Sequence, residues 1–176
     1  AELGWGEWSD KLIPSVLDPR VCGGSHEGIL AVYSLSKQSN LAGYRAAFAV
    51  GEASLIKGLV NLRMHSGLNT PAPVQRAMVV ALGDYEHVAI AKEIYRERRE
   101  VLLAAIRAYG FELADSEAGL YLWATLGEDC WKTVDRMADL GIVVVPGTFY
   151  GEHATDFVRF SITATDDKIA EAATRL

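Results

Sequence analysis

The stretch Ser34-Leu-Ser-Lys37-Gln-Ser-Asn-Leu-Ala-Gly43-Tyr-Arg45 lies between two apolar runs, residues 29–33 and 46–50. This setting predicts that Lys37 stands in a loop at the end of a buried strand. A lone lysine in a loop is usually a surface charge, because burial disfavours the ammonium form. A desolvated lysine amine, however, can attack a carbonyl carbon near neutral pH. Lys37 is therefore either a surface lysine or a candidate nucleophile.

The residues around Lys37 favour the second interpretation. Hydroxyl groups flank it at Ser34 and Ser36, and a guanidinium follows at Arg45. Hydroxyl donors and a permanently charged guanidinium suit a phosphate dianion, which takes charge-assisted hydrogen bonds. A reactive lysine beside a phosphate cradle suggests a phosphorylated aldehyde cofactor.

This pattern resembles the lysine segment of the fold-type I aminotransferases that depend on pyridoxal 5′-phosphate. In that family a Ser-x-Ser-Lys run is followed by Asn-Leu-Ala-Gly-x-Arg, as in residues 34–45 here. The family also has a glycine-led strand that ends in Val-Pro-Gly and an aromatic residue, and residues 141–151 are its counterpart. The motifs occur in the family's order.

A further motif places an arginine inside an apolar strand, Phe157-Val-Arg159-Phe-Ser161. Strand alternation puts Arg159 on the face opposite Val158 and Phe160. From the pattern alone, a solvent-facing arginine on an edge strand is as good an interpretation as a functional one. The resemblance favours function, because the family places such an arginine near its C-terminus to bind the substrate α-carboxylate.

The resemblance covers essentially all 176 residues and is to the C-terminal half of the family's chain. It implies an α/β fold in two parts. Residues 1–110 would form the C-terminal part of the cofactor-binding large domain, a mainly parallel sheet with helices, including a long linking helix. Residues 111–176 would form a small α+β domain.

The resemblance also implies a role for each candidate residue. Lys37 would hold the cofactor covalently and then move a proton between the substrate Cα and the cofactor. Ser34 and Arg45 would hold the phosphate with help from Ser36, and Arg159 would bind the substrate carboxylate. The Asn69-Thr70 segment would reach towards the partner subunit's phosphate in a homodimer with shared active sites.

Within the family, residues 34–45 and 69–75 look most like the actinobacterial N-succinyldiaminopimelate aminotransferases of lysine biosynthesis. The implied reaction is transamination of N-succinyl-LL-2,6-diaminopimelate with 2-oxoglutarate and glutamate. The family's N-terminal half carries the acidic partner of the pyridinium nitrogen, so we expect the isolated chain to be inactive. Two alternatives remain open, an aminotransferase-like ligand-sensing module of a transcription regulator and an inactive fragment.

Composition excludes several other classes of function. The net charge of −6 and the pI near 5.2 argue against nucleic acid and against anionic membranes as partners. The apolar runs are too short to span a bilayer, and the two cysteines lack a CxxC motif, so we expect a cytoplasmic protein. The four histidines show no pair at metal-ligand spacing, and we expect no metal site.

Hydrophobic periodicity and glycine positions predict the elements. Strands are expected at 29–35 and 44–50, and helices at 52–66, 70–82 with Thr70 as the cap, and 85–109. Beyond Gly110, strands are expected at 111–114, 120–125, 142–145 and 157–163, with helices at 130–140 and 166–176.

Overall fold

The computed structural model describes residues 14–67, 69–114, 116 and 118–176, which form two compact units that meet between Ile90 and Ala91. The combination of helices with two sheets confirms the predicted α/β class. The contacts divide the chain within a long helix that both units share. The predicted domain boundary at residue 110 stays a prediction.

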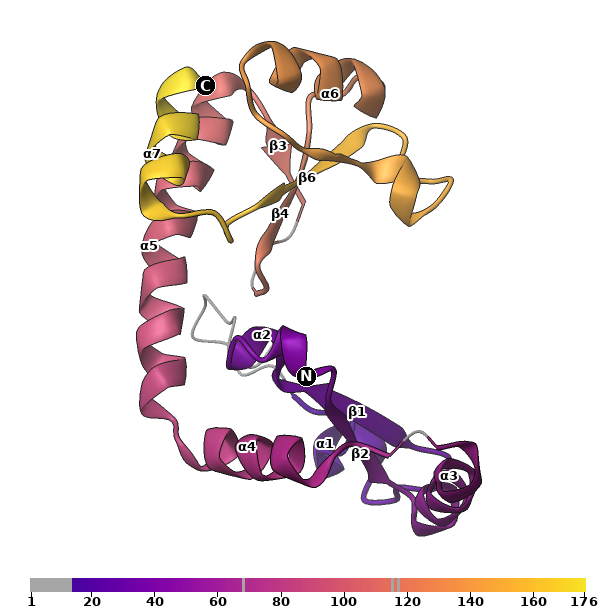
Figure 1. The fold of residues 1–176 in the computed structure, drawn as a ribbon. Helices are drawn as coiled ribbons and strands as arrows, with labels where there is room; N and C mark the ends of the chain where they lie inside the picture. Colours follow the sequence, from indigo (N-terminus) through magenta and orange to yellow (C-terminus); the bar gives the residue numbers. More distant parts are fainter. Residues whose placement is uncertain (1–13, 68, 115, 117) are drawn as a thin grey trace. The chain divides into compact units, whose positions relative to one another are not determined.

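The first unit is a β-hairpin surrounded by helices (Figure 1). Its elements are α1 (Pro19–Cys22), β1 (Leu30–Ser34), α2 (Leu35–Gln38), η1 (Ala42–Tyr44), β2 (Ala47–Gly51), α3 (Ala53–Ser66), α4 (Ala72–Gly83) and the start of α5 (Glu86–Tyr109).

The two strands of the first unit pair antiparallel, from Leu30 opposite Gly51 to Ser34 opposite Ala47. The expected parallel pairing is therefore wrong for this pair. A parallel neighbour needs a long crossover, whereas the connection here holds only short turns, which allow direct reversal. The strands are also less buried in this chain than expected, since the side chain of Val32 remains 61% exposed.

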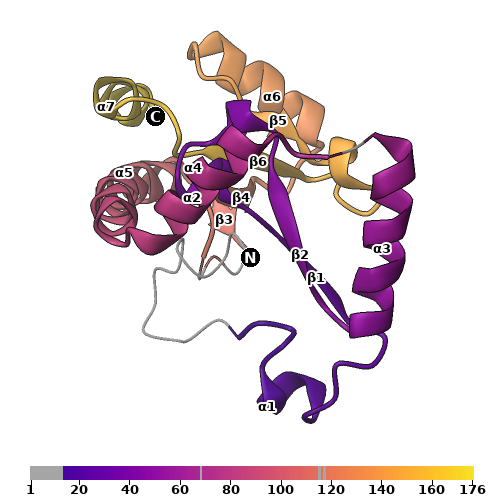
Figure 2. The same cartoon turned by 60° about the horizontal axis from the view of Figure 1, so that its bottom comes forward.

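A small core anchors the hairpin to α2 and α4. Leu35, Ala46 and Met78 are buried together, and six partly buried side chains pack around them: Tyr33, Leu41, Phe48, Val74, Ala81 and Leu82. Figure 2 shows α3 alongside the hairpin, with which it is in contact through β2. The turn that follows β1 is thus held by a buried leucine at its first residue.

Glycine positions predicted the helix ends well. α3 stops at Gly67, whose φ is 71°, and α5 stops before Gly110, whose φ is 111°. Both values lie in the left-handed region, where glycine carries no steric penalty. The prediction that Thr70 caps α4 is wrong: Pro71 takes the cap position, and the Thr70 carbonyl accepts a hydrogen bond from Gln75 Nε2 at 2.7 Å.

The second unit is a four-stranded antiparallel sheet with helices. Its elements are the rest of α5, β3 (Glu112–Leu113), β4 (Tyr121–Thr125), α6 (Cys130–Asp139), β5 (Val145–Pro146), η2 (Gly147–Tyr150), β6 (Phe157–Ser161) and α7 (Asp166–Arg175). The strand order is β3-β4-β6-β5, so β6 lies inside the sheet. The strand expected at 142–145 is shorter, since residues 142–144 form no ladder.

The two faces of this sheet differ in character. Alternate residues of β4 and β6 are buried, among them Leu122, Ala124, Val158 and Phe160. Figure 1 shows α5 and α7 side by side, and Arg98 of α5 forms an ion pair with Asp166 of α7 at 2.5 Å. The opposite face carries half-buried aromatic side chains and Arg159, as strand alternation predicts.

Candidate functional site

The hairpin of the first unit presents the lysine segment at one end. Ser34 is the last residue of β1 and caps α2, because its Oγ accepts a hydrogen bond from the Ser36 backbone N–H at 3.1 Å. Lys37 therefore lies in a single helical turn and not in an irregular loop as predicted. Leu35 and Gln38 are buried on either side of it, while Lys37 itself is half-buried.

Two hydroxyl groups converge beside this turn. Ser34 Oγ lies 2.7 Å from Ser36 Oγ and 3.4 Å from the Ala46 carbonyl oxygen. Because Ser34 pairs with Ala47 across the hairpin, the backbone of Arg45 reaches the same end of the sheet. The hairpin register thus brings the backbones of Ser34 and Arg45 to the same end of the hairpin, where α2 carries Ser36 and Lys37.

The connection itself is conformationally unusual. Asn40 and Arg45 have φ values of 53° and 52°, and they are the two non-glycine residues of the described chain with positive φ. Arginine rarely adopts the left-handed region, and such backbone positions concentrate at ligand sites. Here η1 ends at Arg45, which has this left-handed conformation. The strand β2 therefore starts at Ala47 and not at residue 44 as predicted. The exposed Arg45 side chain donates from Nη1 to the Ala42 carbonyl at 2.9 Å.

The donor set fits the cofactor that the resemblance implies. An amine, two hydroxyls and a guanidinium occur within twelve residues at one end of a hairpin. The hydroxyls and the guanidinium can donate to phosphate oxygens, and the amine can bond to an aldehyde carbon. The four groups therefore suit the phosphate and the aldehyde of pyridoxal 5′-phosphate.

A histidine that received no role from the sequence supports this turn. His87 Nε2 lies 2.9 Å from Ser39 Oγ, and Ser39 is the residue that ends α2. His87 Nδ1 lies 3.0 Å from Asp84 Oδ2. The backbone N–H of Glu86, and then the His87 side chain, lower the pKa of Asp84. Nothing in the local pattern indicates this contact, because 48 residues separate Ser39 from His87.

Arg159 belongs to the second unit, on the central strand β6. It pairs with Trp123 on one side and with Val145 on the other, so the edge-strand interpretation is wrong. Its guanidinium carbon lies 4.0 Å from the centre of the Tyr121 ring and 5.4 Å from that of Tyr150. Its Nε is buried and has no hydrogen-bond partner among the described residues. Arg159 is therefore a half-buried cation in aromatic surroundings.

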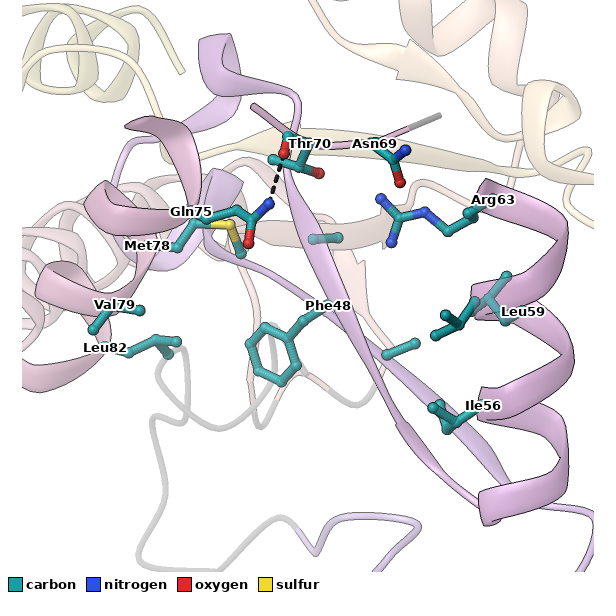
Figure 3. Close-up of a pocket in the computed structure, with 13 residues that line it drawn as sticks. Phe48, Ile56, Leu59, Arg63, Asn69, Thr70, Gln75, Met78, Val79 and Leu82 are labelled. Carbon is teal, nitrogen blue, oxygen red and sulfur yellow. Dashed lines mark hydrogen bonds between the residues drawn. The ribbon is translucent and has the colours of Figure 1, made fainter. Parts of the chain in front are cut away.

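An apolar groove of about 460 Å³ lies beside the hairpin (Figure 3). Phe48 of β2 points into it between Leu59 of α3 and Leu82 of α4. Asn69 and Thr70, which the resemblance assigns to contact with a partner subunit, border its polar end. None of the residues that line the groove belongs to α2, which carries Lys37.

The described residues contain no group of three or more His, Cys, Asp or Glu side chains able to hold a metal ion. In the same part of the chain, no helix has the length and apolarity needed to cross a membrane.

Comparisons with known proteins agree with the motifs. The sequence model of the family described as "Aminotransferase class I and II" matches residues 10–176. The chain is 54% identical, over 99% of its length and 48% of the relative's, to a 4-dedimethylamino-4-oxo-anhydrotetracycline transaminase of Streptomyces rimosus. It is 49% identical, over 99% of its length and 41% of the relative's, to a probable aminotransferase of Mycobacterium tuberculosis. The chain thus spans about half the length of the curated relatives it matches.

Solved structures show the same relationship. An aminotransferase from Staphylococcus aureus superposes with a TM-score of 0.84 at 28% identity, over 98% of this chain and 46% of that one. An aminotransferase from Neisseria meningitidis gives a TM-score of 0.87 at 26% identity, over 98% and 46%.

Proposed function

Since this chain belongs to the class I and II aminotransferase family, we propose that it supplies the cofactor-binding lysine and the carboxylate-binding arginine of a pyridoxal-phosphate-dependent transaminase. The observation that supports this proposal best is the hairpin register, which brings the backbones of Ser34 and Arg45 to the end of the hairpin that carries Lys37. We propose this activity for a longer protein that includes these residues, since they match about half the length of their relatives.

Lys37 is the proposed catalytic residue. The cofactor, when bound, supplies the electron sink that stabilises negative charge at the substrate Cα. The Nζ amine of Lys37 would hold the cofactor through its aldehyde carbon. As a free base, this amine would take up the proton at the substrate Cα and hold it for return.

The remaining residues bind and orient. Arg45 and Ser34 hold the phosphate through charge-assisted and hydroxyl hydrogen bonds, with Ser36 assisting. Arg159 binds the substrate carboxylate and thereby fixes the direction of the Cα–H bond. A transamination reaction uses the same carboxylate site for the amino acid and for the oxo acid, so one arginine serves both half-reactions.

Turnover in the full-length protein tests the assignment of Lys37. We expect Lys37→Ala to lower kcat by at least about 10³-fold, since the amine both bonds to the cofactor and moves the proton. Lys57→Ala is the matched control, because Lys57 is an exposed lysine on α3, and it should keep wild-type kcat. Equal rates for Lys37→Ala and Lys57→Ala would remove Lys37 from the mechanism.

We further propose that activity needs the full-length protein as a cytoplasmic homodimer with shared sites. Apolar side chains such as Val32 on the hairpin and Val80 on α4 are exposed in these 176 residues. Apolar surfaces of this kind are usually covered by further protein, which supports the proposal. The isolated 176 residues should show no turnover, whereas the full-length protein should elute as a dimer and turn over. Full activity of the isolated chain would contradict the proposal.

For the substrate we propose N-succinyl-LL-2,6-diaminopimelate, with glutamate and 2-oxoglutarate as the second pair, in lysine biosynthesis. Relatives named LL-diaminopimelate aminotransferase, 36% identical in one case and 32% in another, lend it distant support. The 54% identical relative is named for a tetracycline substrate. Assays of the full-length protein with glutamate as amino donor should therefore compare two acceptors. One is the oxo acid that corresponds to N-succinyl-LL-2,6-diaminopimelate, and the other is 4-dedimethylamino-4-oxo-anhydrotetracycline. A preference for the tetracycline ketone would overturn the choice of substrate and leave the transaminase assignment intact.

A further inference from the structure

Aromatic rings contact the Arg159 guanidinium, and no ion pair joins it to a carboxylate among the described residues. Arg159 and Tyr121 project from the same face of neighbouring strands, because Arg159 pairs with Trp123 and Tyr121 lies two positions before Trp123. This diagonal arrangement brings the guanidinium carbon to 4.0 Å from the centre of the Tyr121 ring. That distance is well within the range at which a cation is attracted to an aromatic face.

Further aromatic rings lie next to Arg159 and Tyr121 on the same sheet. Trp123 stacks on Phe157 with 5.6 Å between ring centres and 7° between planes. Tyr150 contacts Trp123 edge-on at 5.5 Å and also lies 5.4 Å from the Arg159 guanidinium. Tyr121 and Tyr150 therefore both contact the guanidinium, and its Nε has no hydrogen-bond partner among the described residues.

Aromatic contact positions a guanidinium differently from an ion pair. A carboxylate partner would occupy the in-plane N–H donors, whereas a ring contacts the face of the cation and leaves those donors available. A substrate carboxylate needs two parallel in-plane donors for bidentate binding. Holding Arg159 by its face thus preserves the donors that the carboxylate requires.

We propose that Tyr121 is a positioning residue for Arg159, holding the guanidinium by its face so that its terminal N–H groups bind a substrate carboxylate. This inference rests on the proposed function, because it takes Arg159 as the carboxylate-binding group. Tyr121 acts through Arg159, with which it is in contact.

The test uses the full-length holoenzyme and two measurements, the KM for 2-oxoglutarate and the inhibition constant of succinate, a dicarboxylate that cannot react. Tyr121→Leu removes the aromatic face and should raise both values about tenfold while changing kcat less than threefold. Tyr121→Phe keeps the face and should stay within about twofold of wild type. Tyr95→Leu is the matched control, since the Arg98 guanidinium lies 5.5 Å from the Tyr95 ring on α5, and both values should remain unchanged.

Arg159→Gln separates this inference from the proposed function. If Arg159→Gln leaves the succinate constant unchanged, Arg159 does not bind the carboxylate and the proposed role of Arg159 fails. If Arg159→Gln weakens succinate binding strongly while Tyr121→Leu binds as wild type does, only the inference is overturned. In the Arg159→Gln background, Tyr121→Leu should add nothing, and an undiminished tenfold loss there would overturn the inference. Should Tyr121→Leu fail to fold, as judged by its melting temperature, Tyr121→Met takes its place with the same expected results.

Discussion

His87 Nε2 lies 2.9 Å from Ser39 Oγ, and this contact joins the first turn of α5 to the residue that ends α2, two positions after Lys37. The same imidazole contacts Asp84 Oδ2 at 3.0 Å through Nδ1. The turn that carries Lys37 is thereby tied to the connection between α4 and α5, in addition to the apolar contacts of Leu35.

Replacing this imidazole should loosen the turn. His87→Leu removes both polar contacts, and we expect the free energy of unfolding to fall by about 0.5–1 kcal/mol, since the side chain is partly exposed. His153→Leu, at an exposed histidine in the second unit, should leave it unchanged. Denaturant unfolding of the full-length protein measures the stability of both variants. A denaturation midpoint of His87→Leu equal to that of the wild type would show that the polar contacts of His87 do not stabilise the protein.

The carboxylate at the start of α1 predicts a specific titration. Arg20 donates from its side chain and from its backbone N–H to Asp18, which lowers the pKa of Asp18 to about 2. A lowered pKa in the folded state means that the interaction contributes stability above the unfolded value of 3.8, and loses it as the pH falls towards 2. In Arg20→Ala the Asp18 pKa should rise towards 3.8. Carboxyl NMR titration checks this, and an unaltered Asp18 pKa in the variant would refute the assignment to Arg20.

Two glycines should respond oppositely to alanine. At Gly147 an added Cβ would lie 2.1 Å from the Ala154 carbonyl oxygen and 2.7 Å from that of Phe157. Gly147→Ala should therefore displace η2, which carries Tyr150, and cost about 1–3 kcal/mol. Gly58 lies within α3 with open space around the added Cβ, so Gly58→Ala should stabilise by about 0.5–1 kcal/mol. Thermal melts compare the two variants, and a shift of the same sign in both would contradict this account.

Cofactor affinity should depend on Arg45 more than on Ser36. Arg45→Gln removes the charge proposed to hold the phosphate, and about 1.5–3 kcal/mol of binding, a ten- to 150-fold weaker affinity, should be lost. Ser36→Ala removes one hydroxyl, and we expect the cofactor affinity to weaken by about tenfold or less. Arg76→Gln, at an exposed arginine on α4, is the control. Titration of the full-length apoprotein with cofactor gives all three constants, and an Arg45→Gln constant equal to that of Arg76→Gln would exclude Arg45 from the phosphate site.

Glycine and periodicity gave reliable predictions of the helices. The ends of α3 and α5 follow from Gly67 and Gly110, because a left-handed residue stops a helix whatever its tertiary surroundings. Arg159 was also placed on the correct sheet face, since alternation along a strand is a local property.

Non-local geometry could not be predicted in the same way. An apolar run such as 29–33 is equally consistent with a parallel or an antiparallel partner, so the pairing of β1 with β2 was misjudged. The contacts of Tyr121 with Arg159 and of His87 with Ser39 depend on strand register and on helix packing across long sequence separations. The start of β2 shifted because Arg45 adopts a backbone conformation that arginine seldom takes.

Lys37 is the proposed site of covalent attachment of the cofactor. Borohydride reduction of the full-length holoenzyme converts such a bond into a stable amine, and peptide mass spectrometry then identifies the modified residue. We expect one phosphopyridoxyl group on the peptide that contains Lys37, and none in Lys37→Ala. Modification of a different lysine in the wild-type protein, or of none, would contradict it.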